Sequence, residues 1–225
     1  MRLPPLTFAS ACCWLVLAAA PGPYAQHGSG KPFLVDARGP TRDRKVAPKV
    51  LGGEIALLVD HAAQRPLQLD MKLSAHRIRL GGSVTATFTL TNRGKRPLTI
   101  PLSVNSADIE PPDPLAAGYK FWRLTLSVSL PGPVGLEGGA VLYGDPSVPG
   151  TTHVLEPGGS LVVLADVEAE PTNGPALGPG TASVHAFAYL ERVTETPQKG
   201  GLSEHGAEVA SASSPPCQIK LLPPN

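Results

Sequence analysis

Apolar side chains recur at every second position from Leu67 onward, and this alternation constrains the fold more than any other feature of the sequence. The clearest run is 84–91, where four apolar residues alternate with four threonines. A period of two sends one set of side chains into a core and the other into water, as in a half-buried β-strand. β-Branched threonine suits the exposed face of such a strand. The pattern predicts about eight strands, over residues 67–74, 84–91, 98–104, 121–130, 140–143, 160–168, 181–193 and 217–221. Phe88 and Trp122 lie on the apolar faces of their strands, so we expect both to be largely buried.

The connections between these strands carry typical turn residues. Asn92-Arg93-Gly94 predicts a hairpin turn leading into the strand at 98–104, and Glu156-Pro157-Gly158-Gly159 predicts a second turn. Pro97 and Pro101 remove backbone donors, so we expect the strand at 98–104 to be irregular or to lie at an edge. Long loops are expected over residues 105–118, 169–180 and 194–214, and residues 50–62 fit either a strand or one or two helical turns.

Composition and element order narrow the fold class. The chain contains 24 Gly and 26 Pro in 225 residues, which argues against helical bundles and coiled coils because both need long stretches without these residues. No strand–helix–strand rhythm is present, so a parallel α/β sheet is not expected. One antiparallel sheet alone would leave an apolar face in water, so two sheets should pack face to face. The sequence therefore predicts an all-β fold, an antiparallel β-sandwich within residues 50–225.

The N-terminus has the layout of a secretory signal peptide. Arg2 precedes an apolar stretch from Leu6 to Ala20 of about 15 residues, shorter than the roughly 20 needed to span a bilayer. Small residues follow, ending with Ala25. We expect residues 1–25 to be removed, a mature start between residues 21 and 27, and a secreted or periplasmic protein. The alternative is an uncleaved anchor or a buried apolar segment.

The three cysteines fit this interpretation. Cys12 and Cys13 lie inside the apolar stretch and would leave with the signal, so the mature chain could form no internal disulfide. Lipid anchoring at Cys12 or Cys13 is a weaker alternative, because the apolar stretch before Cys12 is short and continues past Cys13. Cys217 alternates with apolar residues, which favours a small buried side chain over a reactive thiol.

Residues 26–49 form a basic segment between the signal and the domain. Residues 31–96 carry 13 Lys/Arg and 5 Asp/Glu, whereas residues 97–225 carry 5 and 13. The segment 26–49 has few apolar side chains, so we expect a disordered, flexible leader that contributes little to folding. Weak contact with an anionic surface is possible for such a leader, but its charges are too sparse for a nucleic-acid-binding arm.

Several short motifs resemble those of exported bacterial Ig-like domains. They are Arg79-Leu80-Gly81-Gly82-Ser83-Val84, Phe88-Thr89-Leu90-Thr91-Asn92, Leu155 to Ser160, Pro179-Gly180-Thr181 with Ala188-Tyr189, and Pro215 to Leu222. BsuPI-type proteinase-inhibitor domains and the N-terminal sandwich of deuterolysin-like metallopeptidases share this layout. The resemblance implies an Ig-like sandwich over about 155 residues. Because its motifs mostly encode turns, it says more about fold than about function.

The sequence offers no catalytic, cofactor-binding or metal site, and we expect a protein that is not an enzyme and uses no cofactor. Its six histidines lack the spacing of metal ligands. The acidic cluster of Asp108, Glu110 and Asp113 has too few oxygen ligands for calcium, and Ser147 lacks the Gly-x-Ser-x-Gly elbow of a nucleophile. His185 lies on one strand face with two aromatic residues, which fits either a recognition face or a partly buried structural histidine.

Two function classes are favoured, and a third is weaker. The first is an exported, non-catalytic binding or accessory module whose partner is another protein. The second, implied only by the BsuPI resemblance, is a proteinase inhibitor acting through an exposed Pro-containing loop, for which 105–118 and 144–152 are the candidates. A detached regulatory sandwich of a peptidase is a third and weaker class.

Overall fold

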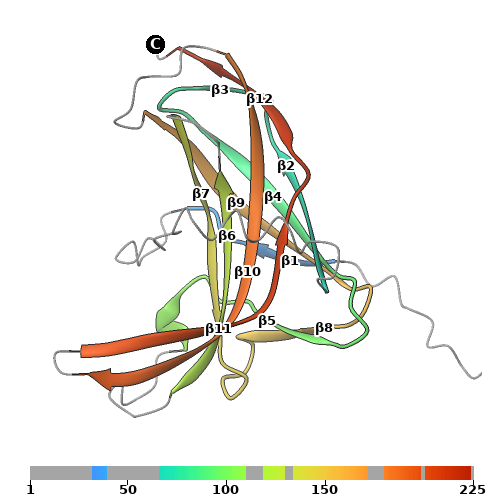
Figure 1. Ribbon diagram of the computed structural model, residues 1–225, viewed down its shortest axis with the longest axis vertical. Coiled ribbons are helices and arrows are strands. Elements are labelled where there is room, and N and C mark those ends of the chain that lie inside the picture. The colour runs from blue at the N-terminus through green and yellow to red at the C-terminus, as the bar shows by residue number, and fades with distance from the viewer. Residues whose placement is uncertain are drawn as a thin grey trace, which may run out of the picture.

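The chain folds almost entirely into β-strands in a computed structural model that describes residues 32–39, 66–109, 119–129, 134–171, 180–198 and 201–223 (Figure 1). A short 3-10 helix, Ser106–Asp108, is the one helix among these residues. No helix in the described ranges has the length and apolar character needed to cross a membrane. The strands are β1 (Phe33–Asp36), β2 (Leu67–Leu73), β3 (Arg77–Arg79), β4 (Ser83–Asn92), β5 (Leu98–Pro101), β6 (Lys120–Ser129), β7 (Val134–Gly144), β8 (Thr152–Leu155), β9 (Ser160–Pro171), β10 (Gly180–Gln198), β11 (Gly201–Ser213) and β12 (Cys217–Leu222).

Ten of these strands form one continuous sheet, in the order β2-β4-β9-β7-β6-β10-β12-β3, with β1 added to β9 and β11 added to β10. β5 and β8 form a separate two-stranded sheet. Most pairs are antiparallel, but β1 pairs with β9 and β3 pairs with β12 in parallel. The all-β class is therefore confirmed, whereas the expectation of purely antiparallel pairing is wrong for these two short edge strands.

The sheet curls because β7 takes part in two pairings. Its first half pairs with β9, and from Gly139 onward it pairs with β6. At the change, Gly138 and Gly139 have φ values of 152° and 139°, where residues with a side chain are strained. A Cβ on Gly139 would also lie 1.9 Å from the carbonyl oxygen of Leu126. The two glycines thus let β7 cross from one half of the sheet to the other.

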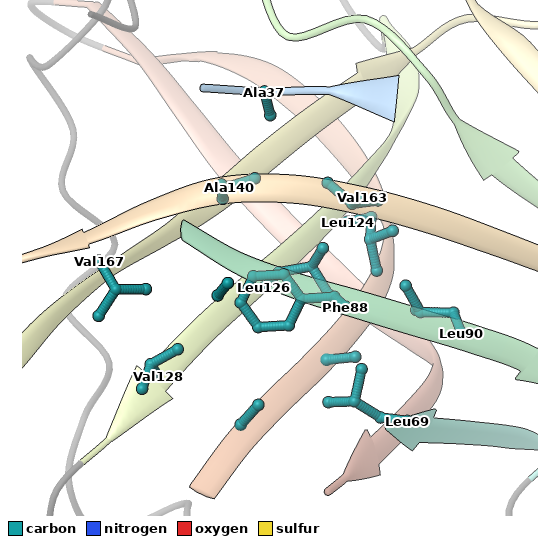
Figure 2. Close-up of a cluster of buried hydrophobic side chains, with 14 of the residues drawn as sticks. Ala37, Leu69, Phe88, Leu90, Leu124, Leu126, Val128, Ala140, Val163 and Val167 are labelled. Atoms are coloured by element: carbon teal, nitrogen blue, oxygen red, sulfur yellow. The ribbon is translucent and has the colours of Figure 1, made fainter. Parts of the chain in front are cut away.

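One hydrophobic core lies between the two halves. Alternate residues of β4 and β9 point into it from one half and those of β6 and β10 from the other (Figure 2). Phe88 at its centre is 0% exposed, which confirms the predicted register of its strand. Trp122 was expected to be largely buried, but it is only partly buried at the margin of this core. Cys217 is also half-buried and packs against the core as a free thiol.

The turn motifs of the sequence hold the core strands together. Glu156-Pro157-Gly158-Gly159 forms a turn in which Gly159 donates to the carbonyl of Glu156 at 2.8 Å and Gly158 has φ 80°, as type II turns require. Asn92 is fully buried beside this turn. Its side-chain amide donates to the carbonyls of Arg96 and Leu155, both at 2.8 Å. Asn92 therefore ties the end of β4 to the turn between β8 and β9.

Two predicted connections are wrong. The turn at Asn92-Arg93-Gly94 does not make a hairpin, because β2 and β9 occupy both edges of β4, and β5 pairs with β8 instead. The predicted loop 194–214 is instead the end of β10 and all of β11, which pair up to Gln198 and Gly201. The predicted ambiguous segment 50–62 lies outside the described residues.

Part of the predicted leader is also ordered. Strand β1 pairs with β9 from Phe33↔Leu161 to Asp36↔Leu164. Val35 and Ala37 are both 8% exposed and join the main core. The expectation of a disordered leader is therefore wrong for residues 33–37, because the edge of β9 that β7 leaves open accepts this short apolar segment. Most of the rest of 26–49, and the predicted signal peptide, lie outside the described residues.

Candidate functional site

The hairpin of β10 and β11 continues beyond the main core as a projecting ribbon, which we call the arm and define as residues 191–208 (Figure 1). β6 accompanies the arm only as far as the pair Lys120↔Thr194. Beyond that pair the sheet contains β10 and β11 alone among the described residues. A two-stranded ribbon is marginally stable in water by itself, so the arm depends on contacts at its base.

A second, smaller core forms at the base of the arm. Phe121 and Val193 are buried there with Ile109, and Tyr119 and Tyr143 pack around them. The ring centroids of Phe121 lie 5.8 Å from those of Tyr119 and 6.3 Å from those of Tyr143, within the range of favourable aromatic pairs. These side chains project from the face of β6 and β10 opposite to the main core, which we call the outer face.

Charged side chains line the outer face along the arm. Arg123 forms ion pairs with Glu191 at 3.0 Å and with Glu204 at 2.6 Å. Burial acts to lower the pKa of Arg123, but the two carboxylates outweigh it and the net pKa is raised. Arg123 thereby links three strands, since it lies on β6, Glu191 on β10 and Glu204 on β11.

Two loops meet beside this core, the segments 101–109 and 144–151, which we call the loop pair. Ser103 and Tyr143 form an isolated bridge, with N–H to O distances of 3.0 and 2.7 Å. Leu102 also donates to the carbonyl of Thr151 at 2.9 Å. The hydroxyl of Tyr119 donates to the carbonyl of Ile109. Both loops are therefore fixed to the base of the arm.

Hydrogen bonds within the segment 144–151 satisfy several of its polar groups and restrain its backbone. The Asp145 carboxylate accepts from the backbone N–H of Ser147 at 2.8 Å and from its hydroxyl at 2.7 Å. The Thr151 hydroxyl lies 2.8 Å from the carbonyls of Asp145 and Val148. Pro146, Ser147, Pro149 and Gly150 remain exposed, and Val148 is half-buried. The segment thus presents a fixed surface to solvent.

Asp145 and Tyr119 titrate away from their ordinary values. Burial acts to raise the pKa of Asp145, but the two hydrogen bonds from Ser147, together with the neighbouring Tyr119 phenol, outweigh it, and the net pKa is lowered. Burial and the neighbouring Asp145 carboxylate both raise the pKa of Tyr119. At neutral pH the pair is therefore a carboxylate beside a neutral phenol.

The structure separates the residues that the sequence singled out. Asp108 ends the short helix beside Ser103 and Asn105, while Glu110 and Asp113 lie outside the described residues. Ser147 is held by Asp145, and His185 is half-buried on β10 opposite Ser129. No group of three or more His, Cys, Asp or Glu side chains suited to a metal ion occurs in the described part of the chain.

The arm and its small core were missed from the sequence. The tract from Ala207 to Ser214 is rich in small residues and resembles a loop. The available signal was Gly200-Gly201 between two stretches of strand-forming length, a spacing typical of hairpins. The burial of Val193 and Phe121 could not be predicted from their strands, because it depends on Ile109 from a distant loop.

Comparisons with known proteins assign no family. No protein-family model matches the chain, and no curated protein matches it. Among solved structures it is similar to the alkylpurine DNA glycosylase AlkC of Pseudomonas fluorescens bound to DNA containing an abasic site analog, with TM-score 0.29, 11% identity and coverage of 70% of this chain and 30% of that one. It is also similar to the sporulation control protein Spo0M of Bacillus subtilis, with TM-score 0.31, 15% identity and coverage of 69% and 49%.

A third similar structure is AvmM, described as catalysing macrocyclization in alchivemycin A biosynthesis, with TM-score 0.26, 14% identity and coverage of 65% and 90%. The chain spans less than half the length of the first two proteins. Agreement at these TM-scores assigns neither a fold family nor a function to the chain.

Proposed function

We propose that the protein is an exported, non-catalytic binding or accessory module with an Ig-like β-sandwich, and that it binds another protein through the loop pair and the arm. The observation that carries the proposal is the convergence of a rigid loop and a projecting ribbon on one small core. Binding sites are commonly loops positioned by a rigid scaffold.

Two features support the Ig-like sandwich within this proposal. The two halves of the curled sheet enclose one core, with β2, β4 and β9 on one side and β6 and β10 on the other. The type II turn at Glu156–Gly159 and the turn in which Gly82 donates to the carbonyl of Arg79 at 2.9 Å coincide with the motifs that resemble exported Ig-like domains.

Export is part of the proposal and rests on Arg2 and the apolar stretch from Leu6 to Ala20. N-terminal sequencing of the protein recovered outside the cytoplasm should begin between residues 21 and 27. Recovery of soluble cytoplasmic protein that retains Met1 would contradict export.

Site-specific photo-cross-linking tests the binding surface. A photoreactive residue is placed at Ser147, exposed in the loop pair, and in a matched variant at Lys72, exposed on β2. Incubation with the exported protein fraction should give a discrete adduct from position 147 and none from position 72. Equal labelling from both positions, or labelling from neither, would contradict binding through the loop pair.

A proteinase inhibitor of BsuPI-like type is the second candidate, and the rigidity of 144–151 favours it because an inhibitory loop must hold its shape. Against it, Val148 donates to the carbonyl of Asp145 and Thr151 to that of Val148, at 2.9 and 3.3 Å. These successive turns keep the segment from the extended form that pairs with a strand. Inhibition of any member of a broad protease panel, lost on deletion of 146–149, would favour the inhibitor.

A further inference from the structure

The arm leaves one edge of β11 open. β11 is 13 residues long, and among the described residues it pairs with β10 alone. Residues 204–209 are all exposed. A long open edge presents unpaired backbone donors and acceptors that can accept another strand. Natural proteins block such edges with proline, charged side chains, bulges or a covering element. Residues 201–213 contain no proline, and the register shift of β11 lies after Glu208, outside 204–208.

The direction of the backbone groups on the arm follows from one hydrogen bond. Glu195 donates its N–H to the carbonyl of Tyr119, on the side of β6, at 2.9 Å. Because backbone groups alternate sides along a strand, the groups of Thr194 face β11. Thr194 pairs with His205, so the backbone groups of His205, and of Ala207 two residues on, face β10.

The backbone groups of Glu204, Gly206 and Glu208 therefore face the open edge. Their side-chain positions lie on the outer face, since Glu204 reaches Arg123 and a Cβ on Gly206 would lie 2.3 Å from an oxygen of Glu191. The opposite face of the same edge carries His205 and Ala207, and the exposed Val209 follows at the register shift between the two strands. The edge is thus acidic on one face, with a histidine and small or apolar side chains on the other.

Resting on the proposed binding function, we propose that this edge accepts an extended segment of a partner protein in which basic and apolar residues alternate. Such a segment would pair its backbone with Glu204, Gly206 and Glu208 and place its basic side chains beside the glutamates on the outer face. A second copy of the chain is disfavoured, because antiparallel pairing of two β11 edges would bring Glu204 and Glu208 of both copies onto one face.

The test uses the full mature chain and three fluorescein-labelled synthetic peptides: (Lys-Val)4-amide, its Glu-Val counterpart, and a Lys-Val peptide whose four central backbone amides are N-methylated. Binding is measured by fluorescence anisotropy. The Lys-Val peptide should bind at least about tenfold more tightly than the N-methylated peptide, because methylation removes backbone donors on both sides of the peptide without changing its charge. The Glu-Val peptide should not bind. Equal binding of the Lys-Val and N-methylated peptides would overturn strand addition.

Amide hydrogen exchange gives a second readout that does not depend on any variant. Exchange at Glu204, Gly206 and Glu208 should slow when the Lys-Val peptide is bound, whereas exchange at Ala207 should already be slow in the free protein. Unchanged exchange at the three edge amides would overturn the inference. Slow exchange at these three amides without peptide, in a dimer that forms with rising protein concentration, would also overturn it, since a second copy of the chain would then occupy the edge.

Charge reversal tests the acidic side of the edge. Glu208→Lys should weaken binding of the Lys-Val peptide by about fivefold, the effect of one exposed ion pair. The matched variant Glu168→Lys on β9 should leave the affinity unchanged. Equal effects of the two reversals would contradict a defined edge site. If Ser147 gives a cross-link but the Lys-Val peptide does not bind, only the proposal for the β11 edge is refuted. If the peptide protects the edge amides but Ser147 gives no cross-link, only the loop pair is refuted as the binding surface.

Discussion

The main core and the small core at the base of the arm are built on the same two strands but on opposite faces of them. In β6, Leu124 and Leu126 point into the main core, whereas Phe121 points to the outer face and is buried there. In β10, Leu190 belongs to the main core and Val193 to the small one. The register shift between Leu190 and Glu191 against β11 lies where the buried face changes.

Alternation specifies a strand without specifying which of its two faces is covered. The main core is closed by strands that supply their own apolar faces from both halves of the sheet. The small core is closed by Ile109, which is brought there by the loop pair. Its stability therefore depends on loop hydrogen bonds such as those of Ser103 and Thr151, and we expect the two regions to unfold with different free energies.

The largest effect is expected in the main core. Phe88→Ala removes a fully buried ring and should reduce the free energy of unfolding by about 3–5 kcal/mol, a large share of the total for one domain. Urea denaturation at neutral pH measures it. A loss of less than about 1 kcal/mol would place Phe88 outside a well-packed core.

A smaller and more local effect is expected for Phe121→Ala. The small core has few buried members, so its cavity can partly collapse, and we expect a global loss of about 2–3 kcal/mol. Amide exchange should accelerate first within 191–208 and the loop pair, while amides of β4 and β9 keep their protection. Uniform acceleration across all strands would show that the two cores unfold as one unit.

The local signals in the sequence predicted most of the fold and, within the candidate site, the two loops but not the arm or its small core. The strand around Phe88 was predicted because its alternation and its burial coincide, and the Gly158 turn because its residues require a particular backbone. The pairing of β5 with β8 was not predicted, since Asn92 directs the chain away from a hairpin through contacts with the distant carbonyl of Leu155. Partners separated by many residues leave no local periodicity.

Local sequence also failed to predict the strand β11 of the arm. Ala210 and Ala212 are buried although small residues there resembled a loop, because they face closely packed strands. Between the end of β11 at Ser213 and the start of β12 at Cys217, Ser214 keeps the chain beside β10. Its N–H donates to the carbonyl of Ala186 and its hydroxyl accepts from the N–H of Ala186, both at 2.9 Å. The two prolines can be read from the sequence, but the pairing of Ser214 with Ala186 cannot.

Removing β1 should have an intermediate effect on the main core. A chain that starts at Val50 loses Val35 and Ala37 from the core, and since ordering a short strand offsets part of that burial, we expect a net loss of about 1–2 kcal/mol. For a domain of this size that is a fall in Tm of a few degrees. Within the full mature chain, Val35→Ala should lower Tm and the matched variant Leu34→Ala, at a side chain 60% exposed, should not. An unchanged Tm for the truncated chain would show that β1 contributes nothing.

The smallest effect is expected from Asp145, and it should depend on pH. Because the pKa of Asp145 is lowered in the folded protein, its ionised form stabilises the fold above the unfolded-state pKa of about 4. This stabilisation is lost as pH falls through the lower folded pKa. Asp145→Asn should therefore reduce the free energy of unfolding at pH 7 by about 1 kcal/mol or less, and the difference in this free energy between variant and wild type should shrink toward pH 3.

Urea denaturation at pH 7, 5 and 3 measures this difference, with Ser147→Ala as the partner variant. If the Ser147 hydroxyl acts through the carboxylate, its removal should have less effect in the Asp145→Asn background than alone, and a gap that stays constant with pH would mean that Asp145 acts by shape and not by charge.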